Sequence, residues 1–437
     1  MNGLEPRLLC VRTLMRSLES GSYGNLALNS ALAKAGNTDP RDRALCTRLF
    51  QNTMERLITL DACIAAHVSR PPEKLDPAVR AVLRCGICEL LYFSTPESAA
   101  VNLWTEAVKR LKKTSAAGMV NAVLRGFLRA GREIPLPEDA LGALSVEYSV
   151  PVPLLQMLTA EHGAETVRAF LADAAQVPPI YLRRNPLACT AAEFAETVPD
   201  AAPVPAIPCA YICERGGEAL DEAKVAGAHM HVQDLASQLC CLALDPQPGE
   251  TVLDVCAAPG GKTFTIAEMM RNEGRVYAYD LHENRVSLIR RGAQRLGLSC
   301  ITAGQGDARQ TEKPQADRVL CDVPCSGYGV IRRKPEIRYK APETVSELPQ
   351  IQYDILEAAA KAVRPGGTLV YSTCTVLRRE NADVVTKFLA AHSDFSLVLP
   401  FEKYPEIAAR TGTEKLLTLF PQMLHSDGFF IAKMRRA

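Results

Sequence analysis

Residues 251–263 decide the fold of this chain, and they read Thr251-Val252-Leu253-Asp254-Val255-Cys256-Ala257-Ala258-Pro259-Gly260-Gly261-Lys262-Thr263. Four apolar or β-branched residues lead into a small turn with two glycines, and a helix-like run follows as far as Met270. A buried strand, a tight turn and a helix form the entry unit of a doubly wound α/β sheet. The start of such a helix offers free N–H groups, and glycine lets a ligand approach the backbone. We therefore expect a cofactor pocket at this turn.

Several interpretations of the turn compete. The phosphate-binding loop of ATP-binding proteins requires Gly at the position of Cys256. The dinucleotide fingerprint G-x-G-x-x-G is absent, because Ala257, Ala258 and Pro259 occupy the turn. S-adenosylmethionine binds to the same topology with looser glycine requirements. For Gly260-Gly261 taken alone an ordinary structural turn is the simpler interpretation, and only the residues further along the chain favour a cofactor.

Length and composition are those of an ordinary protein with about three domains. The chain has 437 residues, of which 47% are hydrophobic and 23% charged. The net charge of +1 argues against a generally basic nucleic-acid coat, but it does not exclude a local basic patch. No apolar run approaches the roughly 18 residues that cross a membrane, and the charged N-terminus is unlike a signal peptide.

Cysteine usage predicts reduced thiols and a cytoplasmic protein. The chain has 15 cysteines and no secretion signal. Their spacing contains no pair of C-x-x-C units, so we expect no metal site. The single unit, Cys85 with Cys88, lies in a helical apolar pattern and predicts core packing.

The chain divides into three predicted domains. Residues 1–133 have apolar residues at helical spacing and predict an all-α bundle. Residues 145–232 predict a small mixed α/β domain with a strand at 179–183, and residues 233–437 predict the doubly wound sheet. Within the bundle we expect helices at 42–60, 76–93 and 96–111. Some of its basic residues could contact RNA phosphates or form a solvated face, namely Arg7, Arg12, Lys109, Arg110, Lys112 and Lys113.

Strand and helix patterns alternate in the last domain, as a parallel sheet covered on both faces requires. We expect strands at 251–255, 275–279, 318–321 and 368–372, and helices at 263–271, 284–296 and 351–362. The final segments, 395–399 and 428–433, predict an antiparallel edge.

Acidic residues follow the second and third strands, at the edge where doubly wound sheets bind ligands. Asp280 ends the second strand, where a carboxylate can accept hydrogen bonds from both ribose hydroxyls, and the same placement serves NAD. Asp307, in Gly306-Asp307-Ala308, could meet an adenine amino group or form an ordinary turn. Asp280 alone therefore does not separate the two cofactors.

Two cysteines and an aspartate follow the fourth and fifth strands. The fourth strand ends in Cys321-Asp322-Val323-Pro324-Cys325-Ser326-Gly327, and the fifth in Tyr371-Ser372-Thr373-Cys374-Thr375. Cytosine C5 is a poor nucleophile, so its methylation requires a thiolate that first attacks C6. A carboxyl such as Asp322 can stabilise charge at N3, and a second cysteine can help remove the C5 proton. Buried cysteine as a small hydrophobe is the alternative, and the residues alone do not rank Cys325 and Cys374.

Together these motifs resemble the RNA 5-methylcytosine methyltransferases of the NOL/NOP/Sun family. The resemblance rests on residues 254–263, 322–327 and 372–374, with further likeness in Arg332-Arg333-Lys334-Pro335, Pro365-Gly366-Gly367, Glu380-Asn381 and Asp427-Gly428-Phe429-Phe430. The N-terminal bundle resembles the NusB family in Arg41-Asp42-Arg43-Ala44 and Asn121-Ala122-Val123-Leu124-Arg125-Gly126. The resemblance covers nearly the whole chain and is weakest between residues 134 and 227.

The resemblance implies a class I (Rossmann-like) methyltransferase fold with S-adenosylmethionine as cofactor. It also implies methylation of cytosine C5 in 16S (small-subunit) ribosomal RNA, of the cytosine-967 type. Cys374 would be the attacking thiolate, Cys325 would assist release, and Asp322 would serve both the cofactor pocket and the cytosine. Asp280 would hold the ribose and Asp307 the adenine side. The methionine part of the cofactor would lie along Cys256, Ala257, Ala258, Pro259, Gly260, Gly261 and Lys262, of which Lys262 could instead meet the RNA backbone.

A basic run follows the Cys325 loop and predicts contact with RNA phosphates at the mouth of the site. It consists of Arg332, Arg333, Lys334, Arg338 and Lys340. A solvated loop is the alternative.

The leading hypothesis is a monomeric S-adenosylmethionine-dependent methyltransferase of small-subunit ribosomal RNA that needs neither metal nor membrane. The second is an RNA-binding or antitermination factor with a vestigial catalytic domain, against which the intact Asp322, Cys325 and Cys374 argue. The paired cysteines disfavour a small-molecule or protein methyltransferase. The missing glycine fingerprint disfavours an NAD-dependent enzyme.

Overall fold

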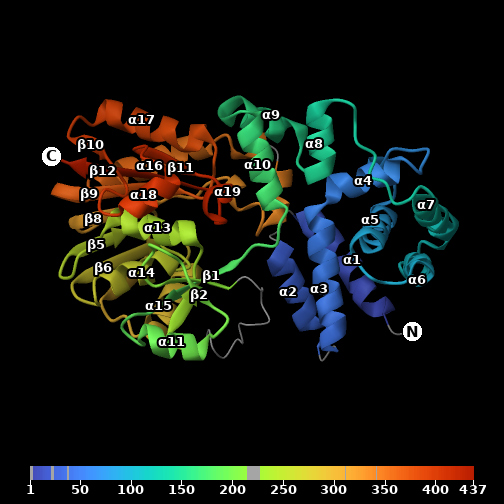
Figure 1. Cartoon of the computed structure of the whole chain (residues 1–437), viewed down its shortest axis with the longest axis horizontal. Helices are drawn as coiled ribbons and strands as arrows, with labels where there is room; N and C mark the ends of the chain where they lie inside the picture. The colour runs from blue at the N-terminus through green and yellow to red at the C-terminus, as the bar shows by residue number, and fades with distance from the viewer. Residues whose placement is uncertain (1–2, 21–23, 37–38, 214–226, 311, 341) are drawn as a thin grey trace. The chain divides into compact units, whose positions relative to one another are not determined.

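The computed structural model describes residues 3–20, 24–36, 39–213, 227–310, 312–340 and 342–437. The chain folds into two compact units (Figure 1). The helical unit comprises Met1–Leu171 and Arg333–Ala341, and the sheet unit comprises Ala172–Arg332 and Pro342–Ala437. The segment Arg333–Ala341 thus belongs to the helical unit, although its neighbours in sequence on both sides belong to the sheet unit.

Helices build the first unit, as the apolar spacing predicts. They are α1 (Leu4–Ser20), α2 (Gly24–Lys34), α3 (Pro40–Glu55), α4 (Leu57–Ala65), η1 (Pro72–Lys74), α5 (Pro77–Tyr92), α6 (Glu97–Arg110), η2 (Thr114–Ala116), α7 (Ala117–Arg129), α8 (Ala140–Tyr148), α9 (Val152–His162) and η5 (Pro335–Tyr339), with α10 (Ala164–Ala174) crossing the unit boundary. Asp76 begins α5 by accepting the Ala78 N–H at 2.9 Å, with Pro77 at the first helical position. The single helix predicted at 42–60 is wrong, because Arg56 leaves helical geometry (φ −123°, ψ 29°) and separates α3 from α4.

The core of the helical unit is apolar. Phe50, Trp104 and Phe127 are among its largest fully buried side chains. Cys85 and Cys88 are also fully buried on α5, so this C-x-x-C unit packs in the core. Packing therefore accounts for both thiols.

One charged group lies inside this core. Glu89 is fully buried and accepts hydrogen bonds from Arg7 Nε (2.8 Å), Thr95 Oγ1 (2.6 Å) and Trp104 Nε1 (2.9 Å). Arg7 is only 3% exposed, so neither alternative expected for it, contact with RNA phosphates or a solvated face, describes its position in this structure. Its charge is matched by a carboxylate 82 positions away, which local patterning does not reveal.

A small antiparallel sheet begins the second unit. Its strand order is β2-β3-β1-β4, with β1 (Ile180–Arg184), β2 (Ala202–Pro203), β3 (Ala210–Cys213) and β4 (Met230–Val232). The helix α11 (Ala191–Thr197) covers it, and Phe194 packs there against Tyr211 with ring centroids 4.4 Å apart. The strand predicted at 179–183 is β1, shifted by one residue.

The large sheet has the predicted doubly wound order. Its strands run β10-β12-β9-β8-β5-β6-β7, and β11 pairs with β12. They are β5 (Thr251–Asp254), β6 (Arg275–Asp280), β7 (Ile301–Gln305), β8 (Ala316–Asp322), β9 (Val363–Thr373), β10 (Phe395–Val398), β11 (Leu416–Leu419) and β12 (Phe429–Arg436). The strands β5 to β9 are parallel, and the order reverses between β5 and β8. Ligands bind at such a reversal, outside the carboxyl ends of the strands.

Helices cover both faces of this sheet (Figure 1). On one face lie α13 (Leu235–Leu244), α14 (Gly261–Met269) and α15 (Glu283–Leu296), and on the other α16 (Leu348–Ala360) and α17 (Ala382–Ala391). Successive side chains of a strand point to opposite faces of the sheet: Val252 belongs to the apolar core with α13, α14 and α15, and Leu253 to the core with α16 and α17. The remaining short elements are α18 (Pro405–Thr411), α19 (Pro421–Leu424), η4 (Tyr328–Val330), η6 (Pro342–Val345) and η7 (Arg378–Glu380).

The last strands differ in part from the expectation. The predicted antiparallel pair exists as β10 and β12, with Phe395 opposite Arg436. However, β12 lies inside the sheet between β9 and β10, and β11 was not predicted. Among the described residues no single helix is long and apolar enough to cross a membrane, and α8 with α9 passes that test only as a pair bent by 112°.

Candidate active site

The turn between β5 and α14 forms the floor of the site. Gly260 has φ +114°, and a Cβ there would lie 2.4 Å from the ring of Phe264, so this position requires glycine. The next strand braces the turn, because Ala257 N–H donates to Tyr279 O at 2.8 Å. The turn is therefore a fixed surface above the carboxyl end of β5.

A cavity of about 220 Å³ lies against this turn. Of the predicted cofactor residues, those that line it are Cys256, Ala257, Ala258, Pro259, Gly261, Lys262 and Asp322. Sequence reasoning missed the other lining residues, which are Val232, Gln233, Asp234, Ser237 and Asp254. Gly260, Asp280 and Asp307 are not among the lining residues.

Asp254 gives the cavity an unsatisfied acceptor. Its Oδ2 accepts a hydrogen bond from Thr263 Oγ1 at 2.7 Å, whereas its buried Oδ1 has no partner within the described part of the chain. Burial raises the pKa of Asp254 to about 7, although the Thr263 hydroxyl partly opposes the shift. Buried polar atoms are normally paired, so an orphan beside a cavity is suited to a polar ligand atom.

Lys262 and Asp322 form an ion pair in the same cavity. Lys262 Nζ lies 2.8 Å from Asp322 Oδ2, and Ser372 Oγ donates to Asp322 Oδ1 at 2.7 Å. Burial alone would lower the pKa of Lys262, but the carboxylate of Asp322 outweighs it and holds that pKa above its ordinary value. Lys262 therefore stays charged and orients Asp322.

The two predicted cysteines meet at neighbouring strand ends. Cys325 follows β8 and Cys374 follows β9, and their Sγ atoms are 3.2 Å apart. The loops are tied together by Val323 N–H donating to Ser372 O (3.1 Å) and Gly329 N–H donating to Cys374 O (3.0 Å). The hydrogen bond with Cys374 and burial together raise the pKa of the Cys325 thiol.

Buried polar residues hold these loops in place. Glu380 Oε2 accepts the Ser326 N–H at 2.9 Å and a hydrogen bond from Gln352 Nε2 at 2.9 Å. On the other loop, Asn381 Nδ2 donates to Thr375 O at 2.9 Å. The Glu380-Asn381 pair thus positions the segments that carry both cysteines.

The other two predicted acids already have partners. Asp280 is buried, and its Oδ2 accepts the Ala258 N–H at 3.3 Å and lies 3.3 Å from Arg285 Nη1. Asp307 accepts hydrogen bonds from Arg309 N, Nε and Nη2, at 2.9, 3.0 and 2.7 Å, and these lower its pKa. In this structure Asp280 braces the turn, and Asp307 closes a local bend with Arg309.

The basic run does not form one exposed surface. Within the sheet unit, Arg332 pairs with Asp173 at 2.8 Å, and both side chains are 3% exposed. Within the helical unit, Arg338 is 4% exposed and donates to Glu55 O (3.2 Å) and Tyr148 O (2.9 Å). The prediction of phosphate contact is therefore wrong for Arg332 and Arg338, because their guanidinium groups satisfy buried acceptors.

Comparison with known proteins agrees with this geometry. Residues 241–435 match the model of the 16S rRNA methyltransferase RsmB/F family, and residues 4–129 match the NusB family. The chain is 36% identical over 449 residues to "Probable ribosomal RNA small subunit methyltransferase B" of Bacillus subtilis (strain 168), covering 98% of each chain. It is 34% identical over 414 residues to "Ribosomal RNA small subunit methyltransferase B" of Yersinia pseudotuberculosis serotype O:1b (strain IP 31758), covering 91% of each.

Among solved structures, the crystal structure of PH0851 is similar with a TM-score of 0.81 at 26% identity, covering 99% of each chain. The similarity to named relatives thus extends over nearly the full length of the chain. The chain belongs to the ribosomal RNA small subunit methyltransferase B (RsmB) family, with a NusB-type helical region before a class I methyltransferase fold.

Proposed function

We propose that this protein methylates C5 of a cytosine in 16S ribosomal RNA, of the position-967 type, and uses S-adenosylmethionine as its methyl donor. The observation that carries the proposal is the pair of cysteines at 3.2 Å beside the Lys262–Asp322 pair. Methylation of an amino nitrogen or an oxygen has no use for two thiols, whereas C5 methylation requires a nucleophile and benefits from a group that assists release. The family membership agrees with RNA as the substrate.

The residues around the turn fit S-adenosylmethionine. The unpaired Oδ1 of Asp254 can accept a hydrogen bond from the amino group of the methionine part. Backbone N–H groups at the start of α14 can meet its carboxylate. By family resemblance Asp280 holds the ribose and Asp307 the adenine side. Each carboxylate would then accept hydrogen bonds from the cofactor in addition to those from its present partners. When bound, the cofactor supplies an electrophilic methyl group.

Cys374 acts as the nucleophile in this proposal. Its sulfur bonds to C6 of cytosine, and the electrons of the C5–C6 double bond make C5 nucleophilic. The hydrogen bond with Cys374 and burial raise the pKa of Cys325, so Cys325 keeps its proton. By family resemblance Cys374 is the thiolate that attacks. After methyl transfer C5 loses its proton, the double bond re-forms and the bond from Cys374 to C6 breaks, with Cys325 assisting.

Asp322 and Lys262 act on the ring from the N3 edge. Negative charge develops on the cytosine when the thiolate adds, and the ammonium of Lys262, 2.8 Å from Asp322, offsets it. A base must leave its stack to reach both cysteines, so the substrate is a loop or a locally opened segment of RNA.

The helical unit offers a surface for RNA in the same proposal. A cavity of about 660 Å³ between α1, α2 and α3 is lined by the basic residues Arg12, Arg16, Lys34 and Arg43, and by the acidic Glu5 and Asp42. The excess of basic residues supports contact with phosphates.

The test is a trapping experiment. Cys325→Ala, incubated with small-subunit ribosomal RNA and S-adenosylmethionine, should give a slow-migrating, RNase-sensitive band on a denaturing protein gel, because release is impaired. The double variant with Cys374→Ala should lose the band, and Cys374→Ala alone should lower methyl transfer by at least about 10³-fold. Cys300→Ala, at a half-buried cysteine away from the cavity, is the matched control and should behave as wild type.

Other outcomes are equally informative. A band with Cys374→Ala alone would reverse the roles of the two cysteines. Absence of any band, together with no methyl transfer by the wild type, would reject the proposal in favour of an RNA-binding factor.

A further inference from the structure

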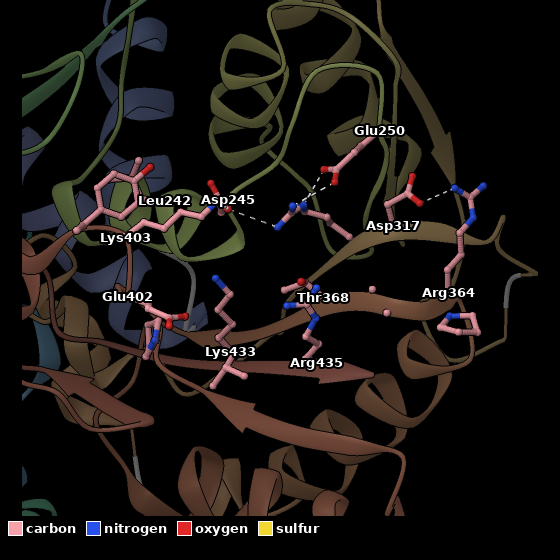
Figure 2. A pocket seen from close by; sticks show the side chains of 17 residues that line it. Leu242, Asp245, Glu250, Asp317, Arg364, Thr368, Glu402, Lys403, Lys433 and Arg435 are labelled. Atoms are coloured by element: carbon pink, nitrogen blue, oxygen red, sulfur yellow. Dashed lines mark hydrogen bonds and ion pairs between the residues drawn. The ribbon is translucent and has the colours of Figure 1, made fainter. Parts of the chain in front are cut away.

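A second cavity of the sheet unit lies at the opposite edge of the large sheet (Figure 2). Its volume is about 370 Å³, and it is lined from the starts of β8 and β9, the end of β12 and the loop after β10. Arg318 in its wall precedes Asp322 by four residues on β8, which corresponds to about 13 Å along the strand. The cavity is therefore separate from the candidate active site.

Most charges in the wall are already neutralised. The ion pairs of this wall are Arg318 Nε–Glu250 at 2.6 Å, Arg318 Nη1–Asp245 at 3.8 Å, Arg364–Asp317 at 2.6 Å and Lys403–Asp245 at 2.6 Å, and dashed lines in Figure 2 mark such pairs. Each carboxylate of these pairs has its own cation. The pairs therefore leave no net charge and give the cavity a polar wall.

Two cations remain on β12. Lys433 and Arg435 alternate with the fully buried Met434, so both project from the same side of the strand, toward the cavity (Figure 2). Neither side chain has a hydrogen bond or an ion pair in the described ranges of the chain. Lys433 is half-buried, and burial lowers its pKa, with the nearby Arg318 and Lys403 acting in the same direction against Asp245 and Glu402.

The half-buried Lys433 would gain from an anion, because removing a cation from water without a partner is costly and a bound anion would offset that cost. The exposed Arg435 supplies a second cation on the same side of β12. In the lining, Glu402 is the carboxylate for which the described structure gives no ion pair, so the unpaired groups carry a net charge of about +1. The site is thus electropositive although its wall contains several acids.

We propose that this cavity binds a terminal phosphate group together with at most about one attached nucleotide, and that Lys433 and Arg435 hold the phosphate. A guanidinium and an ammonium two residues apart can share the oxygens of one tetrahedral anion. The volume lies in the usual range of small-molecule sites, about 300–1,000 Å³. Such a phosphate can belong to a free nucleotide or to the end of an RNA strand, and the chemistry of recognition is the same.

Calorimetric titration of the full-length protein tests the proposal. The probes are inorganic phosphate, adenosine monophosphate, and a two-nucleotide RNA with either a 5′-phosphate or a 5′-hydroxyl. Lys433→Gln and Arg435→Gln should each weaken binding of the phosphate-bearing probes by about tenfold or more. Glu402→Gln removes the unpaired acid and should strengthen binding of the phosphate-bearing probes several-fold. Lys415→Gln, at an exposed lysine elsewhere in the sheet unit, is the matched control.

The outcomes separate specific binding from general attraction to a charged surface. Tighter binding of adenosine monophosphate identifies a free nucleotide, and tighter binding of the 5′-phosphorylated RNA identifies an RNA end. Equal binding of the 5′-hydroxyl RNA, equal weakening by Lys415→Gln, or no binding of any probe at millimolar concentration would overturn the proposal. Methyl transfer should be unchanged in all four variants, and Arg435→Gln, at an exposed position, keeps the test open if Lys433→Gln fails to fold.

Discussion

Two buried carboxylates, Glu89 in the helical unit and Asp254 in the sheet unit, have opposite surroundings. Both oxygens of Glu89 are engaged, Oε1 by Thr95 and Arg7 and Oε2 by Trp104 and Arg7. Asp254 receives one hydrogen bond from a side chain, on Oδ2, and its Oδ1 has no partner in the described structure.

The difference separates a structural group from a functional one. A buried carboxylate with a full set of donors stabilises the fold. A buried carboxylate with an empty acceptor destabilises the ligand-free protein, and it persists where a ligand completes it. Glu89 does not line the cavity between α1, α2 and α3, whereas Asp254 lines the cavity at the turn between β5 and α14. Variants of the two residues should therefore shift stability in opposite directions.

Glu89→Ala should give the largest loss of stability. It leaves Arg7 buried without its counter-ion and Trp104 Nε1 without its acceptor, so the free energy of unfolding of the helical unit should fall by about 3–5 kcal/mol. Urea denaturation followed by tryptophan fluorescence measures this directly, because Trp104 is the single tryptophan of the chain.

The control is Glu106→Ala on α6. Glu106 lies 3.4 Å from Lys109, and both side chains are well exposed, so its removal should change the free energy of unfolding by about 0–1 kcal/mol. If Glu89→Ala costs no more than Glu106→Ala, the buried network does not stabilise the helical unit.

Asp254→Asn should stabilise the ligand-free sheet unit at high pH. The pKa of Asp254 is about 7 in the fold and about 3.8 when unfolded, so its favourable contribution is complete below pH 4 and is lost as the pH rises to 7. The loss is at most about 4 kcal/mol, at about 1.36 kcal/mol per pH unit. Calorimetric unfolding at pH 8 should therefore favour the variant, and the difference should shrink as the pH falls toward 4.

Two further measurements sharpen this result. S-adenosylmethionine should bind Asp254→Asn about tenfold more weakly, because an amide is a poorer acceptor than a carboxylate for an ammonium group. Asp383→Asn removes an exposed carboxylate on α17, 3.3 Å from Arg378, and should show no such pH-dependent difference from the wild type. If Asp254→Asn is instead less stable than the wild type at pH 8, both carboxylate oxygens of Asp254 accept hydrogen bonds in the ligand-free protein.

The sequence predicts the doubly wound fold and the convergence of three polar side chains at one sheet edge, because both depend on local pattern. Strand residues alternate between two buried faces, so β5, β6, β8 and β9 stand out as apolar runs. Parallel strands end at the same edge, and Asp322, Cys325 and Cys374 therefore converge without any knowledge of loops.

Residues that depend on distant partners were not predictable. Gln233, Asp234 and Ser237 line the cavity at the turn between β5 and α14. They come from the loop before α13 and from its first turn, where no motif marks them. Arg7 and Arg338 look like surface cations in sequence, yet each satisfies acceptors of its own unit that lie far away along the chain. A charged residue is buried when a partner exists in three dimensions, and periodicity carries no record of that partner.

The smallest expected effect concerns Glu380, a buried carboxylate that is intermediate between the fully paired Glu89 and the partly unpaired Asp254. Glu380 Oε2 accepts hydrogen bonds from the backbone N–H of Ser326 and from Gln352 Nε2, while its Oε1 is buried without a partner in the described residues. Glu380→Gln should loosen the Cys325 loop and lower kcat for methyl transfer about tenfold, with KM for RNA unchanged.

A structural role alone would lower the amount of folded enzyme, whereas a positioning role should also let the RNA–protein adduct accumulate on a denaturing gel, as with Cys325→Ala. Glu357→Gln, at a half-exposed carboxylate on α16 that pairs with His392 at 2.8 Å, is the control and should form no adduct. An unchanged rate with no adduct would show that the loop keeps Cys325 in place without Glu380.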